Sequence, residues 1–370
     1  MKTWQQLTHD AGFDWARDPH DIAVVDGQGH LVAQFRIEHT LAGWQEFRQK
    51  ISAYPALGVV IETNQGAAVD QLLQAEGVTV YPIHPMSAQR YRERKSPTGN
   101  KTDQLDARSL ADALRLDGSQ WKALAPLDPL TQQLRLLCRD EMSLIEQRTA
   151  LINQLRQAVS EYYPAVLEAF EDWRRPSVWK FVIEFPTPEI LLKRKRSRWE
   201  KFLHKHRLWR SDTGEKRLEI FARAGAFCGS PGVTAAKSLL AVSLARLLGL
   251  LQNQLDEYRS QIEKLFEPHP DSGLFGSLPG AARYLAPRLL GEVTADAQRF
   301  EDPQALQCLA GTGPVSYPSG QIHKVRVRHA CNKTLRHIIH LWADCARHAA
   351  PWAQPTTNKN ASKARATPAL

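Results

Sequence analysis

The sequence has few cysteines, and none of them are closely paired. Its 370 residues contain 5 cysteines, an odd number, and no two of them stand at the Cys-x-x-Cys spacing. A disulfide framework and a structural zinc module both need cysteines in pairs, so the sequence argues against both. We therefore expect a protein of a reducing compartment, the cytosol.

Long hydrophobic runs are also missing. The first residues carry no apolar signal region, and no run approaches the roughly 20 apolar residues that a membrane-spanning helix needs. We expect a cytoplasmic protein without a membrane partner.

Acidic residues are in the minority. There are 39 Asp and Glu against 48 Lys and Arg, a net charge of +9, which favours an anionic partner such as nucleic acid. The basic residues cluster at 90–95, 193–198 and 323–328. Trp199 follows the second cluster, an arrangement that suits phosphate contacts with base stacking, although a solvated basic face fits that segment equally well. The candidate contacts to nucleic acid are Lys193, Arg194, Lys195, Arg196, Lys324, Arg326 and Arg328.

Short β-rich runs alternate with helical patterns over residues 8–125. Residues 21–25 and 31–37 flank a glycine-containing turn and predict a hairpin, while 57–61 is a continuous apolar run typical of a buried central strand. Helical spacing follows at 41–51 and 67–75. The order predicts an α/β domain, a mixed sheet flanked by helices, whose site lies beyond the carboxyl ends of the strands.

Two long helices are predicted in the middle of the chain. Apolar positions recur at steps of three and four over 131–163 and over 244–265, so we expect coiled-coil helices within 126–170 and 233–268. They can pair within the chain, between chains or both, and we expect a homo-oligomer, a dimer or a tetramer. Residues 171–232 look irregular, basic and tryptophan-rich, as in a linker or insertion. Residues 269–350 predict a small, mainly helical C-terminal domain, and 351–370 a disordered tail.

Four acids stand at predicted strand ends and at a helix start: Asp14, Glu62, Asp103 and Asp106. The last two are three residues apart in the first turn of a helix that Thr102 or Asp103 would cap, so they share one side of it. Taken alone, such a pair more often complements the helix dipole. If all four converge, they form an all-oxygen site suited to Mg²⁺, which assists phosphodiester cleavage.

Ser319 is a candidate nucleophile. It precedes a glycine in a predicted turn and lies close to the cations Lys324, Arg326 and Arg328, which could stabilise an anionic phosphorus centre. A plain turn is the simpler interpretation, because Pro-Ser and Ser-Gly are common turn dipeptides.

These motifs occur together, in order, over nearly the whole chain, and so the sequence resembles the IS110 family of transposases. Asp14, the Val59-Val60-Ile61-Glu62-Thr63 strand end and the Asp103-Gln104-Leu105-Asp106-Ala107 stretch resemble its RuvC-like N-terminal domain. The C-terminal half resembles the second conserved domain of the family at Leu278-Pro279-Gly280, Arg299-Phe300, Gly311-Thr312-Gly313-Pro314, Ser319-Gly320 and Asn332-Lys333-Thr334-Leu335-Arg336.

The resemblance implies an RNase H-like, RuvC-type domain over 8–125, with Asp14, Glu62, Asp103 and Asp106 as Mg²⁺ ligands. Ser319, or Ser316 three residues before it, would attack DNA in a transposase or site-specific recombinase that forms a phosphoserine intermediate. The implied partners are the DNA of the element ends and target and a structured guide RNA, in the prokaryotic cytosol or nucleoid.

Two other functions stay open. The protein can be a RuvC-like, Mg-dependent, structure-specific endonuclease that uses water, with Ser319 structural. It can also be a non-catalytic nucleic-acid-binding protein, which the four acids argue against because negative charge repels phosphates.

Overall fold

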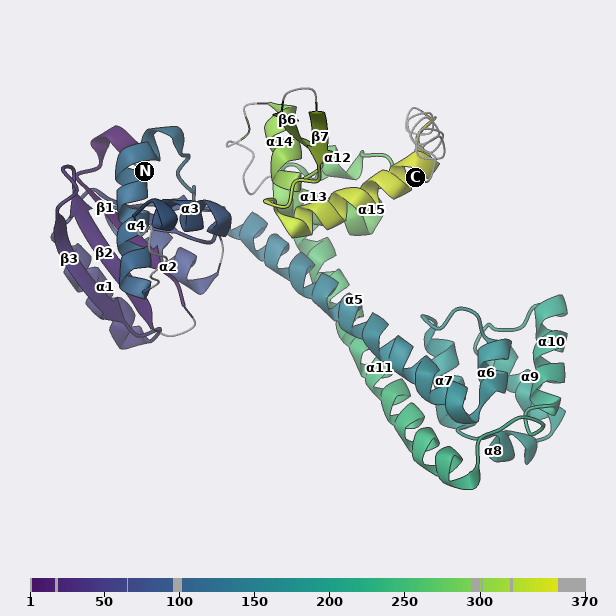
Figure 1. Ribbon diagram of the computed structural model, residues 1–370. Helices are drawn as coiled ribbons and strands as arrows, with labels where there is room; N and C mark the ends of the chain where they lie inside the picture. Colours follow the sequence, from purple (N-terminus) through teal and green to yellow (C-terminus); the bar gives the residue numbers. More distant parts are fainter. Residues whose placement is uncertain are drawn as a thin grey trace. The chain divides into compact units, whose positions relative to one another are not determined.

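We describe the protein from a computed structural model, which defines residues 2–16, 19–64, 66–95, 102–293, 300, 302–319 and 322–351. The side chains of 317–319 and 322–324 are not among those described. The chain forms two compact units: Met1–Pro129 with Glu292–His340, and Leu130–Gly291 with the chain from Leu341 onward. Figure 1 labels the helices and strands of both. The tail expected to be disordered lies, from residue 352 on, outside the described residues.

The first unit begins with a five-stranded mixed sheet in the order β3-β2-β1-β4-β5. Strand β1 is parallel to β4, which is parallel to β5, while β2 is antiparallel to β1 and to β3. The predicted mixed sheet and the hairpin of residues 21–37 are confirmed. The strands are β1 (His9–Asp14), β2 (His20–Asp26), β3 (Leu31–Ile37), β4 (Leu57–Ile61) and β5 (Val78–Pro82).

Helices cover both faces of this sheet. Helices α1 (Leu41–Ile51) and α2 (Ala67–Gln74) bury residues such as Phe47 and Leu72 against one face. Helices α3 (Pro85–Lys95) and α4 (Asp103–Asp117) cover the other, where Leu110 packs with Val60. Short 3₁₀ turns stand at Trp4–Gln6 and Gly118–Gln120. The sandwich is compatible with an RNase H-like domain.

The same unit contains a later part of the chain. This part comprises helix α14 (Pro303–Ala310), the antiparallel hairpin of β6 (Val315–Ser319) and β7 (Ile322–Arg326), and the start of α15 (Lys333–Ala349). Asn332 caps α15, because its Oδ1 accepts a hydrogen bond from the Leu335 N–H at 3.0 Å. Its Nδ2 donates to Glu292 at 2.8 Å, and its backbone N–H donates to the Leu309 carbonyl at 2.7 Å. One asparagine thus joins three segments of this part of the chain.

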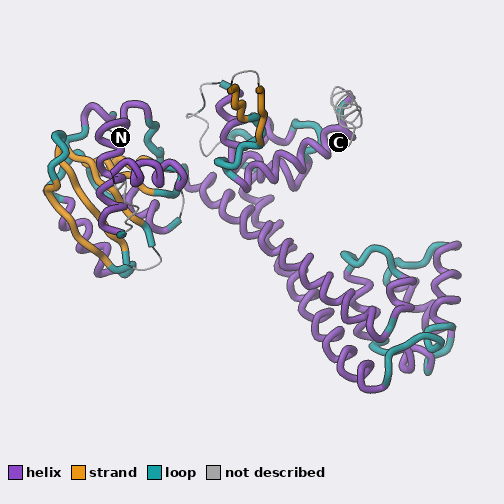
Figure 2. The backbone as a smooth tube through the Cα atoms, viewed as in Figure 1, coloured by secondary structure: helices purple, strands orange, loops and turns teal. Residues whose placement is uncertain are grey.

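The second unit is built on two long helices, α5 (Pro129–Tyr162) and α11 (Pro231–Phe266). They run antiparallel, because Lys237 pairs with Glu161 at 2.8 Å, Gln252 with Arg148 at 2.8 Å, and Arg259 with Glu141 at 2.9 Å. The sequence left open whether the two long helices pair within one chain, between chains or both, and the structure shows a pair within one chain. Figure 2 shows only helix and loop among the described residues of this unit.

Residues 171–232 are not irregular, and that prediction is wrong. They fold into α7 (Pro176–Glu184), α8 (Pro188–Leu192), α9 (Arg196–Lys205) and α10 (Ser211–Ala222), after α6 (Pro164–Ala169). Proline stands in the first turn of α6, α7 and α8, where its missing N–H costs no hydrogen bond. Trp173, Trp179 and Trp199 are buried, and each indole N–H donates to a backbone carbonyl. The tryptophans therefore form a helical core with α5 and α11.

Helices α12 (Ser272–Gly276) and α13 (Ala282–Val293) follow α11. The buried carboxylate of Glu141 accepts hydrogen bonds from Arg288 at 2.5 Å and Arg259 at 2.9 Å. This charge cluster links α5, α11 and α13 within the second unit.

Helix α11 corrects one expectation. It is long and apolar enough to cross a membrane by length and composition, with 22% of that stretch buried in this chain. The expectation that no stretch of the chain is long and apolar enough to span a membrane is therefore wrong for α11. The same test is passed by helices that pack in the core of water-soluble proteins, so it is weak support for a membrane segment.

Candidate functional site: a carboxylate cluster at the sheet edge

The sheet brings two of the predicted acids together. Asp14 is the last residue of β1, and Glu62 directly follows β4. These strands are parallel neighbours with Phe13 opposite Ile61, so Asp14 and Glu62 leave the sheet side by side at its carboxyl edge. Because side chains alternate and Phe13 belongs to the core under α1 and α2, Asp14 faces the side covered by α3 and α4.

Helix α4 supplies the other two. The Thr102 side chain caps it by accepting from the Leu105 N–H at 3.2 Å, so Asp103 and Asp106 lie in its first turn as predicted. The helix packs directly on β1 at Gly12, where an added Cβ would lie 1.8 Å from the Ala107 carbonyl oxygen. This contact, beside Asp106 on α4 and two residues before Asp14 on β1, holds the start of the helix over the strand end.

The carboxylates influence one another. Burial, followed in order of size by the charges of Asp106, Asp103, Glu62 and Asp21, raises the pKa of Asp14 from 3.8 to about 7. The charges of the predicted acids Asp106, Asp103 and Glu62 thus act on Asp14. Like charges gathered around one carboxyl favour the binding of a proton or a cation.

Arginines balance part of this charge. Arg92 of α3 donates to Asp106 at 3.0 Å, and Arg36 of β3 donates to Asp21 at 2.8 Å and lies 3.9 Å from Asp103. Among the residues that the structure describes, no three His, Cys, Asp or Glu side chains are arranged to hold a metal ion as they stand. Asp106 is buried, and its Oδ1 has no hydrogen-bond partner there. An all-oxygen set with an unsatisfied buried oxygen fits a hard cation such as Mg²⁺.

Sequence reasoning missed the buried Asp21 and its partner Arg36, and it missed Arg92. Asp21 pairs with Asp14 in the β1–β2 register, so a hairpin-register argument could have found it. Arg92 belongs to the basic run at 90–95, but which residue of that run meets an acid depends on how α3 packs on α4.

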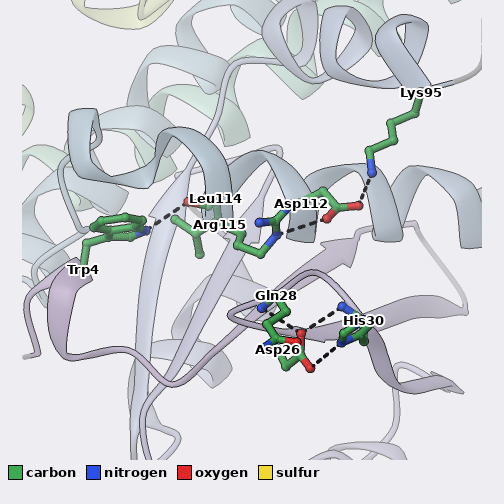
Figure 3. A network of polar contacts seen from close by, with 8 residues as sticks. All are labelled: Trp4, Asp26, Gln28, His30, Lys95, Asp112, Leu114 and Arg115. Carbon is green, nitrogen blue, oxygen red and sulfur yellow. Dashed lines mark hydrogen bonds and ion pairs between the residues drawn. The ribbon is translucent and has the colours of Figure 1, made fainter.

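A second group of charges lies further along α4 (Figure 3). The buried Asp112 is bonded to Lys95 of α3 and to Arg115 at 3.4 Å. Near it, the pKa of Asp10 of β1 is raised from 3.8 to about 6. Burial is the main cause of the rise, which the charge of Arg115 reduces and that of Asp112 increases. The Trp4 indole donates to the Leu114 carbonyl at 3.0 Å and ties the N-terminal segment to the same helix.

Ser319 is the last residue of β6 and is paired with Ile322 of β7. The side chains of Ser319 and Lys324 lie outside the described residues. Arg326 ends β7 with an exposed side chain, and the carbonyl of Arg328 accepts a bond from Arg336.

The basic run at 193–196 lies in the second unit. Lys193 pairs with Glu189 at 2.5 Å, and Arg196 pairs with Glu200 at 3.1 Å and Glu215 at 2.5 Å. Arg194 and Lys195 are exposed. Trp199 points inward, so the predicted alternation of cations with a stacking ring is wrong for this run.

The fold and site define an α/β domain with a carboxylate cluster at its sheet edge, joined to a helical unit. Residues 11–164, which contain all four acids, match the family model of the IS110 DEDD domain, described as a transposase. Residues 272–357, which contain Ser319, match the model described as transposase of the IS116/IS110/IS902 family.

The sequence is similar to those of several curated proteins, two of them over most of this chain. The mini-circle putative transposase for IS117 of Streptomyces coelicolor is 32% identical over 361 residues, 95% of this chain and 87% of the relative. The putative transposase y4uE of Sinorhizobium fredii is 30% identical over 208 residues, 55% of this chain and 58% of the relative. An uncharacterized 44.8 kDa protein of insertion element IS116 from Streptomyces clavuligerus is 28% identical over 319 residues, which are 84% of this chain and 77% of the relative. The chain belongs to the IS110 family of transposases.

Proposed function

We propose that this protein is a DNA transposase that cleaves and rejoins strands at the ends of its insertion sequence and at the target. Its N-terminal domain is RNase H-like, of the RuvC type, and Asp14, Glu62, Asp103 and Asp106 are its metal ligands. The observation that carries the proposal is that Asp14 and Glu62 stand at the ends of two parallel neighbouring strands and Asp106 at the start of the helix packed on them, so that like charges gather where a cation is needed. Burial, and after it the charges of these acids, raises the pKa of Asp14 to about 7.

Mg²⁺ fits the four carboxylates because they offer only oxygen donors. When bound, it would supply charge stabilisation for the attacking and leaving oxygens of a phosphodiester. The four carboxylates themselves position the reacting DNA strand and accept or donate protons. Arg92, which pairs with Asp106, keeps a positive charge beside the cluster.

Ser319 is proposed as the nucleophile. Its Oγ attacks the phosphorus of a DNA phosphodiester, the Oγ–P bond forms, and the P–O bond to the neighbouring sugar breaks. The Oγ proton passes to a carboxylate of the cluster, and the leaving oxygen takes up a proton. Attack by the released hydroxyl of another strand reverses these steps and rejoins the DNA. The cations Lys324, Arg326 and Arg328 follow in sequence and would offset the charge of the intermediate.

Trapping of the covalent intermediate tests this assignment. Ser319→Ala should abolish a protein–DNA adduct and recombination while retaining DNA binding. Ser316→Ala, at the alternative nucleophile, should retain the adduct and recombination, and the reverse result would assign the attack to Ser316. Each single change of Asp14, Glu62, Asp103 or Asp106 to Ala should abolish strand cleavage with an unchanged circular dichroism spectrum. Cleavage without an adduct would favour the hydrolytic endonuclease, and no cleavage with Mg²⁺ would favour a binding protein.

A structured RNA and a second protomer complete the proposal. The guide RNA rests on the family resemblance, and sequencing RNA that co-purifies with the protein tests it. Oligomerisation is supported by apolar side chains that α11 leaves exposed, among them Leu239, Leu247 and Leu250. Light scattering should give a dimer or tetramer, and a monomer both free and with nucleic acid would contradict it. We expect this assembly in the prokaryotic cytosol or nucleoid.

A further inference from the structure

A basic pocket opens beside the sheet of the first unit. Its volume is about 550 Å³, within the range of pockets that hold small ligands or single nucleotides. It is formed by the end of β5, one side of α3 and the segment after Gly118–Gln120. The described residues that line it include no acid; those with a charge or a ring are His84, Arg90, Tyr91, Arg94, Trp121 and Lys122.

Helix α3 divides its basic residues between two sides. Arg92 pairs with Asp106, and Lys95 pairs with Asp112, so these two neutralise acids of α4. Arg90 and Arg94 are one helical turn apart on the side that lines the pocket, and both are exposed. Neither forms an ion pair with an acid in the part of the chain that the structure describes. Their charge is therefore available for an anion.

An aromatic wall stands beside these cations. Tyr91 and Trp121 meet edge to face with ring centroids 5.9 Å apart, and the Tyr91 hydroxyl donates to Asp117 at 2.7 Å. Both rings are half-buried, so their orientation is held while part of each surface remains open. Fixed rings next to cations are the combination that binds single-stranded nucleic acid, through stacked bases and a neutralised backbone.

The pocket is close to the carboxylate cluster. Arg92, which bonds to Asp106, lies between Arg90 and Arg94 on the same helix, so one helix diameter of about 10–12 Å separates the two sides of α3. Phosphates along one strand of B-DNA are roughly 3.4 Å apart, and an extended single strand spaces them more widely, so at most about three nucleotides bridge that distance.

We propose that this pocket is a subsite for single-stranded DNA, which holds nucleotides within about three positions of the scissile phosphate. Arg90 and Arg94 bind its phosphates, and a base stacks on Trp121 or Tyr91. A duplex is disfavoured because its bases are already stacked on one another and do not present a free face. The choice of DNA over RNA rests on the proposed function, since the neighbouring carboxylates are assigned to DNA cleavage.

Binding of a labelled oligodeoxythymidine to the 370-residue chain, without added divalent metal, is the first test. The double variant Arg90→Ala/Arg94→Ala should bind more weakly, and the slope of log K against log salt should fall by about 1.4, or about 0.7 per phosphate contact. The control Arg48→Ala/Lys50→Ala removes the same charge from α1, on the opposite face of the sheet, and should keep the slope of the unmodified protein. Equal losses in the two double variants would overturn the subsite.

Photocrosslinking locates the strand without any substitution. An oligodeoxynucleotide with 5-iodouracil should crosslink to Trp121 or Tyr91, identified by mass spectrometry of the digested protein. Crosslinks only outside residues 84–122, or crosslinks at the pocket with an RNA of the same sequence but not with DNA, would overturn the proposal. Neither test measures cleavage, so a protein that binds here but never cuts DNA would contradict the proposed function and leave the subsite standing.

Discussion

Gly12→Ala is expected to disable the carboxylate cluster without touching a carboxylate. The new Cβ would lie 1.8 Å from the Ala107 carbonyl oxygen and 2.7 Å from the Leu110 Cβ. A carbon and a carbonyl oxygen need about 3.3 Å, so α4 must move by about 1.5 Å. A backbone carbonyl cannot rotate away as a side chain can, so we expect a loss at or above the upper end of the usual overpacking range of about 1–3 kcal/mol. Asp106 precedes Ala107 on the helix and moves with it.

The loss of activity should be measurable separately from the loss of stability. A displacement of about 1 Å in a reacting group can reduce the rate about 100-fold, so DNA strand cleavage should fall by at least that factor at a temperature where the variant is still folded. Urea unfolding gives the stability, and circular dichroism checks the fold. The matched control is Gly27→Ala, because a Cβ at Gly27 meets nothing within 4 Å. A Gly12→Ala protein as stable and active as the control would refute the close packing of α4 on β1 and the convergence of the acids.

Two further predictions concern buried charge. Because burial raises the pKa of Asp10 from 3.8 to about 6, the native state binds its proton more tightly than the unfolded chain does, and stability falls as pH rises from about 4 to about 6. Asp10→Asn should remove this fall and raise the free energy of unfolding at pH 7, measured in urea, by at most about 3 kcal/mol. If the free energies of unfolding of the variant and the unmodified protein differed by the same amount at every pH, the prediction would be contradicted. Glu141→Gln should lower the free energy of unfolding by about 3–5 kcal/mol, because it leaves Arg259 and Arg288 without their buried anion. The control is Glu257→Gln, at an exposed residue of α11, which should change the free energy of unfolding by no more than about 0.5 kcal/mol. Equal effects of Glu141→Gln and Glu257→Gln would show that the buried charge cluster contributes nothing to stability.

The acid positions were predictable because each depends on a local signal. Asp14 and Glu62 stand where apolar runs end, and Asp103 and Asp106 follow a capping threonine; parallel strands then place the first pair at one edge. Their counter-ions were not predictable. Arg36 reaches Asp21 across a strand pair, and Arg92 reaches Asp106 between two helices, so both depend on register and packing angle.

The tryptophan-rich segment shows how composition can mislead. Trp173, Trp179 and Trp199 stand among prolines and cations, which looked like a nucleic-acid-binding linker. Their rings are buried and their indole N–H groups satisfied by carbonyls, so they stabilise the short helices of residues 164–222. Short helices have weak periodic signals, because five to twelve residues span too few turns for an apolar stripe to stand out.

The sequence by itself determined the elements whose signals are local: the central apolar strands, the capped start of α4 and the long stripes of α5 and α11. These follow from backbone hydrogen bonding, capping and side-chain periodicity, which act over a few residues. Only the tertiary structure decided that α5 pairs with α11 of the same chain, that Gly12 is where α4 meets the sheet, and which sides of α3 face the acids and the pocket. Those outcomes depend on contacts between residues distant in sequence, and many packings satisfy the same apolar pattern until shape and charge select one.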